Sequence, residues 1–151
     1  MIKVCEYCGK EFNSRRSKYK YCSYSCGSRA RWTEDQSIFK NGLGPEEAYI
    51  LGFICADGCI SYDKHSGRHR LTIASKDKEL IEYLHKRMTP EKSIYFSRGC
   101  YSIVSNNRYD IEFLRQLGIW ERKTSVFSMP IVDKSLVPHL IRGYFDGDGS
   151  V

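Results

Sequence analysis

One short acidic phrase occurs twice in this sequence, at a constant spacing. The first copy is LGFICADGCI and the second is RGYFDGDGSV. Aligning them pairs Gly52 with Gly143 and Asp57 with Asp148, at an offset of 91 residues. A single internal repeat of this length indicates two related supersecondary units rather than a solenoid of many short repeats.

Each phrase is typical of the end of a buried helix. The first helix is expected to have Pro45 near its start and Gly58 at its end. The second is expected to have Ser135 as its N-cap and Gly149 as its terminator. Both helices are apolar nearly all round, which predicts that both are buried.

The glycine and aspartate pairs constrain how these helices pack. A glycine inside a helix costs about 1 kcal/mol against alanine, so Gly52 and Gly143 predict helices that cross with their backbones in contact. Arg142 is then expected on an outer face. Asp57 and Asp148 each end a helix, where the macrodipole disfavours negative charge. If the helices run parallel, the two carboxylates approach each other and form a divalent-metal site suited to magnesium and a phosphodiester.

Two other interpretations of the acidic phrase fit less well. DGDGSV is similar to the start of an EF-hand loop, but the twelfth-position glutamate would fall beyond the sequence, and the first phrase does not fit at all. A helix-stop glycine preceded by a solubilising aspartate explains one occurrence. Two occurrences in register argue against that explanation.

ILGFICADG and IRGYFDGDG resemble the two LAGLIDADG motifs of single-chain homing endonucleases, the DNA-cleaving enzymes of introns and inteins. The resemblance implies that the motif helices form the interface between two similar halves. It also implies that Asp57 and Asp148 bind the metals that cleave opposite DNA strands, and that Ala56 and Gly147 lend backbone carbonyls. The first motif departs from the family at Cys55, where an acidic residue is common. A free thiol there indicates a small buried apolar side chain.

Four cysteines near the N-terminus predict a second metal site. CEYCGKEF supplies Cys5 and Cys8, and YCSYSC supplies Cys22 and Cys26, with 13 residues between the pairs. Two close thiolate pairs are the ligand set of a closed, structural zinc site, and so short a segment needs the metal to fold. Gly9 suits the turn after the first pair. Two disulfides are the alternative, but nothing else in the sequence indicates secretion.

The excess positive charge lies in this same segment. Residues 1–32 hold eight Lys and Arg residues against two acidic residues. Such asymmetry is compatible with a polyanionic partner, nucleic acid first, or with a solvated basic surface. The segment also resembles the CxxCGKxF…KYCSxxC fingers found beside intron- and phage-encoded endonuclease domains. The candidate phosphate contacts are Arg15, Arg16, Lys18, Lys20, Arg29 and Arg31.

The middle of the chain completes an αββαββα pattern. CISYD and RLTIAS are expected to be strands, and SIYFS and CYSIVS a hairpin that turns at Arg98 and Gly99. Asp77 is expected to cap one helix, and a shorter helix is expected to end at Gly118. The predicted fold class is α+β, in which one LAGLIDADG unit is followed by the second motif helix and preceded by a zinc-binding finger. Its four-stranded antiparallel sheet is expected to carry helices on one face.

The other sheet face is the candidate DNA-binding surface, which the resemblance places in a major groove. An ordinary solvated face is the alternative for each residue, and a register shift of one would exchange the whole set. Lys123, in a stretch that resembles the family's approach to a second motif, is a candidate for stabilising phosphate charge or an ordinary surface lysine. The sheet candidates are Arg70, Thr72, Tyr95 and Ser97 on strands, and Lys64, Arg68, His69 and Arg98 at turns.

The expected domain organisation contains only the start of a second repeat. We expect a finger at 1–32, a linker at 33–43, the first LAGLIDADG repeat at 44–132 and a truncated second repeat at 133–151. A second sheet would therefore come from a longer parent protein or from a partner chain, unless the natural frame is truncated.

The sequence thus predicts a magnesium-dependent, site-specific endonuclease of double-stranded DNA with a structural zinc finger. The alternative is a non-catalytic nucleic-acid binder, either a maturase-like RNA-splicing cofactor or a DNA-binding regulator, which would not require the aspartate pair. A zinc-stabilised protein-interaction module is a third option. No apolar run approaches the roughly 20 residues of a membrane span, and the cysteines and N-terminus indicate a cytoplasmic, reducing location.

Overall fold

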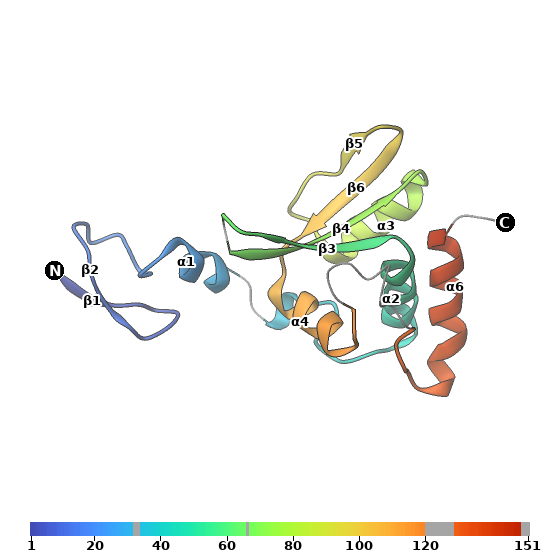
Figure 1. Cartoon of the computed structure of the whole chain (residues 1–151), viewed down its shortest axis with the longest axis horizontal. Helices are drawn as coiled ribbons and strands as arrows, with labels where there is room; N and C mark the ends of the chain where they lie inside the picture. Colours follow the sequence, from blue (N-terminus) through green and yellow to red (C-terminus); the bar gives the residue numbers. More distant parts are fainter. Residues whose placement is uncertain (32–33, 66, 120–128, 149–151) are drawn as a thin grey trace.

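A small N-terminal unit, a four-stranded sheet with its helices, and a last helix make up the fold (Figure 1). The computed structural model describes residues 1–31, 34–65, 67–119 and 129–148. The N-terminal unit, called the finger below, contains β1 (Ile2–Val4), β2 (Glu11–Asn13) and α1 (Tyr24–Ala30). A 3₁₀ turn, η1 (Glu34–Gln36), follows. The sheet unit contains α2 (Pro45–Asp57), β3 (Gly58–Asp63), β4 (Arg68–Ser75), α3 (Lys78–Met88), β5 (Tyr95–Ser97), β6 (Cys100–Ser105) and α4 (Arg108–Gln116), and η2 (Lys134–Leu136) then leads into α6 (Val137–Asp148).

The sheet has the strand order β3-β4-β6-β5, and every neighbouring pair is antiparallel. Leu71, Ile73 and Ile103 are buried on one face of it. Helices α2, α3 and α4 pack against the strands and share this core. The predicted α+β class and the αββαββα order are therefore confirmed.

Local sequence signals explain several element boundaries. Asp77 caps α3, because its Oδ1 accepts the N–H of Leu80 at 3.2 Å. Arg98 and Gly99 have φ values of 53° and 78°, as a tight hairpin turn between β5 and β6 requires. Gly118, with φ of 88°, lies just after α4 in the left-handed region expected of a helix terminator.

Gly58 ends α2 for a different reason from the one predicted. Its φ of −76° and ψ of 144° are extended, and β3 begins at this same residue. A Cβ at this position would lie 2.6 Å from the carbonyl oxygen of Ile54. Glycine is needed here because the chain turns sharply against its own helix, not because a left-handed cap is present.

The start of α6 also differs from the expectation. Ser135 is not the N-cap but lies in η2, where its N–H and hydroxyl both donate to Oδ1 of Asp133, at 2.9 and 2.7 Å. Asp133 is therefore the capping residue, because its side chain satisfies the first donors of the 3₁₀ turn that leads into the helix. The expected terminator, Gly149, lies outside the described residues.

The prediction that both motif helices are buried is correct for α2 and wrong for α6. Ile141 and Phe145 on α6 are 43% and 60% exposed. Only Leu140, Gly143 and Gly147 of this helix are buried. The reason is that α6 packs on α2 along one stripe, and nothing in the described part of the chain covers its other apolar side.

Residues 37–39, interpreted above as part of a linker, belong to the core. Phe39 is buried and stacks on Phe113 of α4, with 4.6 Å between ring centroids. Asp110 of α4 accepts hydrogen bonds from the hydroxyl of Ser37 and from the N–H of Ile38. One aromatic ring and one buried carboxylate hold a segment that has no helical or strand period for sequence analysis to detect.

Asp110 should make stability depend on pH with the sign opposite to that of most carboxylates. Burial raises the pKa of its carboxyl to about 6, although Ser37 and the backbone N–H groups of Ile38 and Phe39 oppose this rise. The folded state therefore holds the proton more tightly than the unfolded chain, and stability falls as pH rises from about 4 to about 6. Asp110→Asn, which keeps an acceptor oxygen, should gain on the order of 2 kcal/mol relative to wild type between about pH 4 and pH 7.

Urea denaturation of both proteins at the two pH values measures this difference. The control is Asp133→Asn. Hydrogen bonds from the backbone and side chain of Ser135 lower the pKa of Asp133, so its stabilising effect is lost as pH falls. Because that pKa lies below the ordinary 3.8, the loss occurs below about pH 4, and the difference between that variant and wild type should stay nearly constant between about pH 4 and pH 7. An Asp110→Asn difference that is independent of pH would contradict the prediction.

Candidate functional site

Helices α2 and α6 lie side by side and make reciprocal backbone contacts (Figure 1). A Cβ on Gly52 would lie 2.0 Å from the carbonyl oxygen of Leu140, and a Cβ on Gly143 would lie 1.9 Å from that of Tyr49. These contacts are equivalent under the 91-residue repeat, in which Tyr49 corresponds to Leu140. The predicted close crossing is confirmed, and the reciprocity indicates an approximate twofold axis between the two helices.

The C-terminal ends of the two helices meet at this axis. A Cβ on Gly147 would lie 2.8 Å from the Cβ of Ala56, and these two residues correspond to each other in the repeat. Asp57 and Asp148 come directly after them, each as the last residue of its helix. Asp57 is half-buried and Asp148 is exposed. The two motif aspartates therefore start from the same end of a parallel helix pair, and their role as metal ligands remains a prediction.

A separate polar contact identifies the outer side of the pair. The hydroxyl of Tyr49 donates to Oδ2 of Asp146 at 2.9 Å, and the guanidinium of Arg142 lies 5.7 Å from the Tyr49 ring centroid. Burial and then Asp146 raise the pKa of Tyr49 to about 12. Arg142 is largely exposed, on the outer face as predicted. Asp146 is thus engaged by Tyr49 on the outer side of the helix pair.

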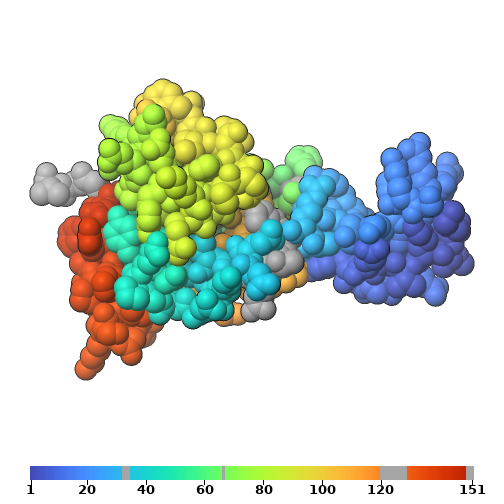
Figure 2. All heavy atoms as spheres, turned by 180° about the vertical axis from the view of Figure 1, so that it is seen from behind, coloured from blue at the N-terminus to red at the C-terminus, as the bar shows by residue number. Residues whose placement is uncertain are grey.

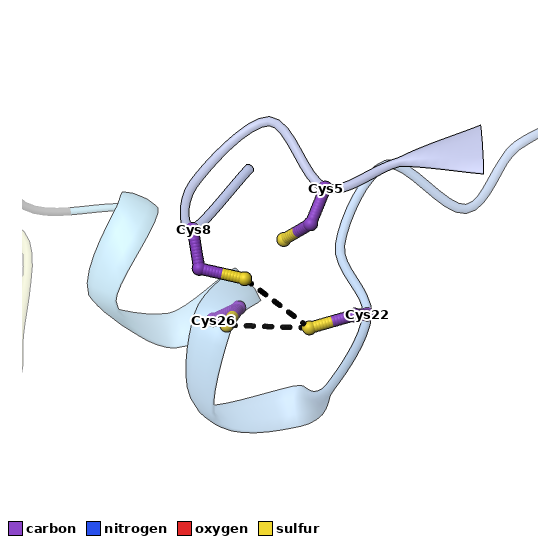
Figure 3. A group of neighbouring side chains, drawn as sticks. All are labelled: Cys5, Cys8, Cys22 and Cys26. Atoms are coloured by element: carbon purple, nitrogen blue, oxygen red, sulfur yellow. Dashed lines mark hydrogen bonds between the residues drawn. The ribbon is translucent and has the colours of Figure 1, made fainter. Parts of the chain in front are cut away.

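The four predicted cysteine ligands converge in the finger (Figure 3). Their sulfur atoms all lie within 4.8 Å of one another. Cys22 Sγ is 3.6 Å from both Cys8 Sγ and Cys26 Sγ, well beyond the roughly 2.05 Å of a disulfide. Gly9 has φ of 72°, and its N–H donates to the carbonyl of Cys5 at 2.9 Å, which closes the first cysteine turn.

This cluster fits a tetrahedral zinc ion. Zinc–sulfur bonds of about 2.3 Å place sulfurs roughly 3.8 Å apart, close to the separations found. Burial acts to raise the pKa of Cys5, but hydrogen bonds from the backbone of Cys8 and Cys22 lower it to about 7. The thiols of Cys8 and Cys26, with burial, raise the pKa of Cys22 to about 12. The Cys22 thiol thus holds a proton that a bound metal would displace, whereas Cys5 releases its proton more readily than a free cysteine.

The open face of the sheet carries the predicted strand contacts. Because β4 buries Leu71 and Ile73, alternation places Arg70 and Thr72 on the opposite face. Strand β6 pairs with both β4 and β5, and this pairing places Tyr95 and Ser97 of β5 on the same face as Thr72. The open face and its exposed turns therefore carry Arg70, Thr72, Tyr95, Ser97, Lys64 and Arg98. DNA contact by these residues stays a prediction.

The predicted basic residues of the finger are all exposed, on a lobe that projects from the rest of the molecule (Figure 2). A cavity of about 760 Å³ lies on this lobe. Four of the candidates line it: Arg15, Lys18, Lys20 and Arg31. The other two are Arg16 and Arg29.

Arg68 lies where the sheet unit meets the finger, and not on the open part of the sheet face. The guanidinium carbon of Arg68 is 4.6 Å from the ring centroid of Tyr24 in α1. The guanidinium carbon of Arg108, at the start of α4, is 5.0 Å from the ring centroid of Tyr7. Figure 1 shows the β3–β4 hairpin extending toward α1, as these contacts require. Two arginine–tyrosine contacts therefore connect the finger to the sheet unit.

His69 lies at the same junction, beside two residues that sequence reasoning missed. Nε2 of His69 is 3.3 Å from Nη1 of Arg115, and Arg115 and Arg108 both line the cavity found here. The two arginines are seven positions apart on α4, so they share one face, on which Ile111 and Glu112 also line the cavity. That spacing of the two arginines was the available signal. Lys123, the remaining candidate, lies outside the described residues.

Comparison with known proteins adds one assignment. Residues 44–118 match a family model described as the LAGLIDADG-like domain. No curated protein matches the chain significantly. None of the helices in the described part of the chain has the length and apolar character needed to cross a membrane.

Proposed function

We propose that this chain, which belongs to the LAGLIDADG family, hydrolyses phosphodiesters of double-stranded DNA at the joined ends of α2 and α6. The family comprises homing endonucleases and maturase-type proteins, so nucleic acid is the substrate class. The observation that carries the proposal is the contact between Ala56 and position 147 at the approximate twofold axis. It places two carboxylates, one residue further on, at the negative ends of two helices, where a bound cation would stabilise both charges.

The donor set at this end suits magnesium. Asp57 and Asp148 offer hard carboxylate oxygens. The carbonyls of Ala56 and Gly147 lie in the last helical turns, where they have no partner within their own helix. A divalent metal bound there supplies an acidified water and charge neutralisation at the leaving oxygen.

The remaining proposed residues bind and orient the DNA. The open sheet face offers Arg70, Thr72 and Tyr95 to one groove, and the exposed lysines and arginines of the finger neutralise backbone phosphates. Dividing these tasks between two units lengthens the DNA segment that is contacted. The finger adds affinity, while the sheet face reads the sequence.

Asp57→Asn should abolish cleavage but spare binding. The substitution removes one charged ligand and leaves the size of the side chain unchanged, so we expect cleavage to fall at least about a hundredfold. The assay is nicking and linearisation of supercoiled plasmids with randomised inserts, in the presence of magnesium, with sequencing of the cut ends. Binding to the selected sequence is measured by fluorescence anisotropy.

Asp146→Asn is the matched control, because Asp146 lies near the end of α6 but bonds to Tyr49 on the outer side. It should cleave like wild type. Equal cleavage by Asp57→Asn and wild type would remove the nuclease assignment. Tight binding without any cleavage by wild type would instead favour the maturase-like or regulatory alternative.

A further inference from the structure

We propose that the cavity between the finger and the sheet unit binds a backbone phosphate of nucleic acid, an inference that rests on the proposed function. The cavity has a volume of about 560 Å³, in the range of ligand sites. Helix α1 lines one side of it, and the β3–β4 turn and α4 line the other. Its charged or titratable lining residues are Arg29, Arg68, His69, Arg108, Arg115 and Glu112.

The charge balance of this cavity favours an anion. Four guanidinium groups line it, and Glu112, which is exposed, is the sole acidic residue among the lining side chains described. Within the described residues, neither Arg68 nor Arg108 forms an ion pair with a carboxylate. Two arginines at one junction are therefore left without a compensating negative charge.

Hydrogen-bond donors of these two arginines are buried without acceptors. Nε and Nη2 of Arg68 and Nε of Arg108 are buried and have no partner in the described structure. A buried donor left unsatisfied costs about 1–3 kcal/mol, and more when it is charged. Nε and one Nη together form the edge of a guanidinium that binds an oxyanion through two parallel hydrogen bonds. A phosphate would satisfy this edge of Arg68. At Arg108, where Nη2 already donates to the hydroxyl of Tyr109 at 2.8 Å, it would accept a hydrogen bond from Nε alone.

Tyrosine stacking fixes both arginines in position. The guanidinium of Arg68 lies against the ring of Tyr24. The guanidinium carbon of Arg108 lies 5.0 Å from the ring centroid of Tyr7 and 4.7 Å from that of Tyr109. Stacking occupies the faces of the guanidinium and leaves its edges for hydrogen bonding. Ordering these long side chains before binding reduces the entropy that a ligand must otherwise overcome.

The electrostatics of the adjoining cavity agree with this assignment. Arg68 also lines a cavity of about 390 Å³ with Lys92 and Asn106. Burial lowers the pKa of the Lys92 ammonium, Glu91 opposes this shift, and the positive charges of Arg70 and Arg68 lower the pKa further. The Lys92 ammonium donates to Oδ1 of Asn106 at 2.8 Å. Three cationic residues, Arg31, Arg68 and Lys92, line this second cavity against one acidic residue, Glu91, so an excess of positive charge lies on both sides of Arg68.

The junction also lies between the two predicted DNA-contacting surfaces. Arg29 of the finger lines the cavity, and Arg70 lies two positions along β4 from Arg68, toward the open sheet face. A strand that follows the basic residues from the finger to the sheet would pass the junction. A phosphate bound there would hold the two units in one relative orientation.

Arg68→Gln and Arg108→Gln test the proposal. Each should weaken binding of a labelled DNA duplex about tenfold at physiological salt. Each should also reduce the slope of log affinity against log salt concentration by about one, since one phosphate contact is lost. Fluorescence anisotropy over a series of salt concentrations measures both quantities, and far-UV circular dichroism with zinc content verifies folding.

Arg142→Gln is the matched control, because it removes the same charge and an arginine–tyrosine contact on the outer face of α6. It should leave affinity and slope unchanged. The proposal would be overturned if Arg68→Gln and Arg108→Gln both bound DNA with the same affinity and the same salt slope as wild type. Two variants are used so that a folding defect in one leaves the other informative.

A separate measurement distinguishes this proposal from the proposed function. If wild type does not bind DNA, the nucleic-acid function fails, and the cavity is then tested with inorganic phosphate alone. A phosphate-dependent rise in Tm that both cavity variants lose and Arg142→Gln keeps would support a phosphate site for a free ligand. No such rise in wild type would overturn the cavity site as well.

Discussion

Gly143→Ala is expected to destabilise the protein by about 3 kcal/mol, although alanine is the better helix former. The added methyl group would lie 1.9 Å from the carbonyl oxygen of Tyr49 and 2.8 Å from its carbonyl carbon. Both are backbone atoms of a buried helix, so they have no alternative rotamer. The two helices must separate, and among the described residues α6 has no other contact of comparable size to hold it. We therefore expect α6 to detach while the sheet unit remains folded.

Urea denaturation and hydrogen exchange measure this effect, and loss of exchange protection should be largest in α6. Gly52→Ala is expected to cost a similar amount, because its methyl group meets Leu140 in the reciprocal contact. The double variant should cost much less than the sum, since helices already separated have room for the second methyl group. Ile141→Ala, on the exposed side of α6, is the control and should change stability little. A Gly143→Ala protein as stable as wild type would mean that the helices do not cross at this pair.

The same glycine contacts show why this part of the fold was predictable from sequence. Gly52 and Gly143 are unfavourable inside helices, so their repetition at one offset is by itself a sign of a tertiary contact. Asp77 and the Arg98–Gly99 turn are local signals, each decided by a few neighbouring residues. A cap or a tight turn of this kind does not depend on contacts with distant parts of the chain. For this reason the element order and the positions of the turns could be predicted together, whereas the sheet register could not.

The parts that sequence analysis missed depend on contacts between distant segments. The side chain of Phe39 is buried because Phe113 faces it, and no period in residues 37–39 records that contact. The exposure of Phe145 is set by what covers α6, which its own apolar pattern does not reveal. The junction of Arg68 with Tyr24 joins two units, each of which appeared complete in isolation. Consequently the paired aspartates were predictable as a candidate site, whereas the arginine cavity was not.

Removing the metal from the four-cysteine cluster should unfold the finger and leave the sheet unit folded. Among residues 1–31, Cys5 is the sole buried side chain of hydrophobic type, while Ile2 and Val4 are 75% and 59% exposed. The finger therefore has almost no apolar core, and we expect metal coordination to supply most of its stability. Structural zinc sites supply an apparent free energy of roughly 10 kcal/mol or more at neutral pH, far above what two three-residue strands contribute. We expect chelation to remove exchange protection from β1, β2 and α1 alone.

Cys22→Ser should reproduce the effect of chelation, because Cys22 is the sulfur 3.6 Å from two others in the cluster. Cys59→Ser is the matched control, since Cys59 is an exposed free thiol on β3 outside the cluster. Zinc content by mass spectrometry and exchange protection by residue distinguish the two variants. The Tyr24–Arg68 contact belongs to a folded finger, so DNA affinity should fall with zinc content in Cys22→Ser and not in Cys59→Ser. A metal-free finger that keeps its exchange protection would show that strand pairing alone folds it, and the cluster would then have to be assigned a different role.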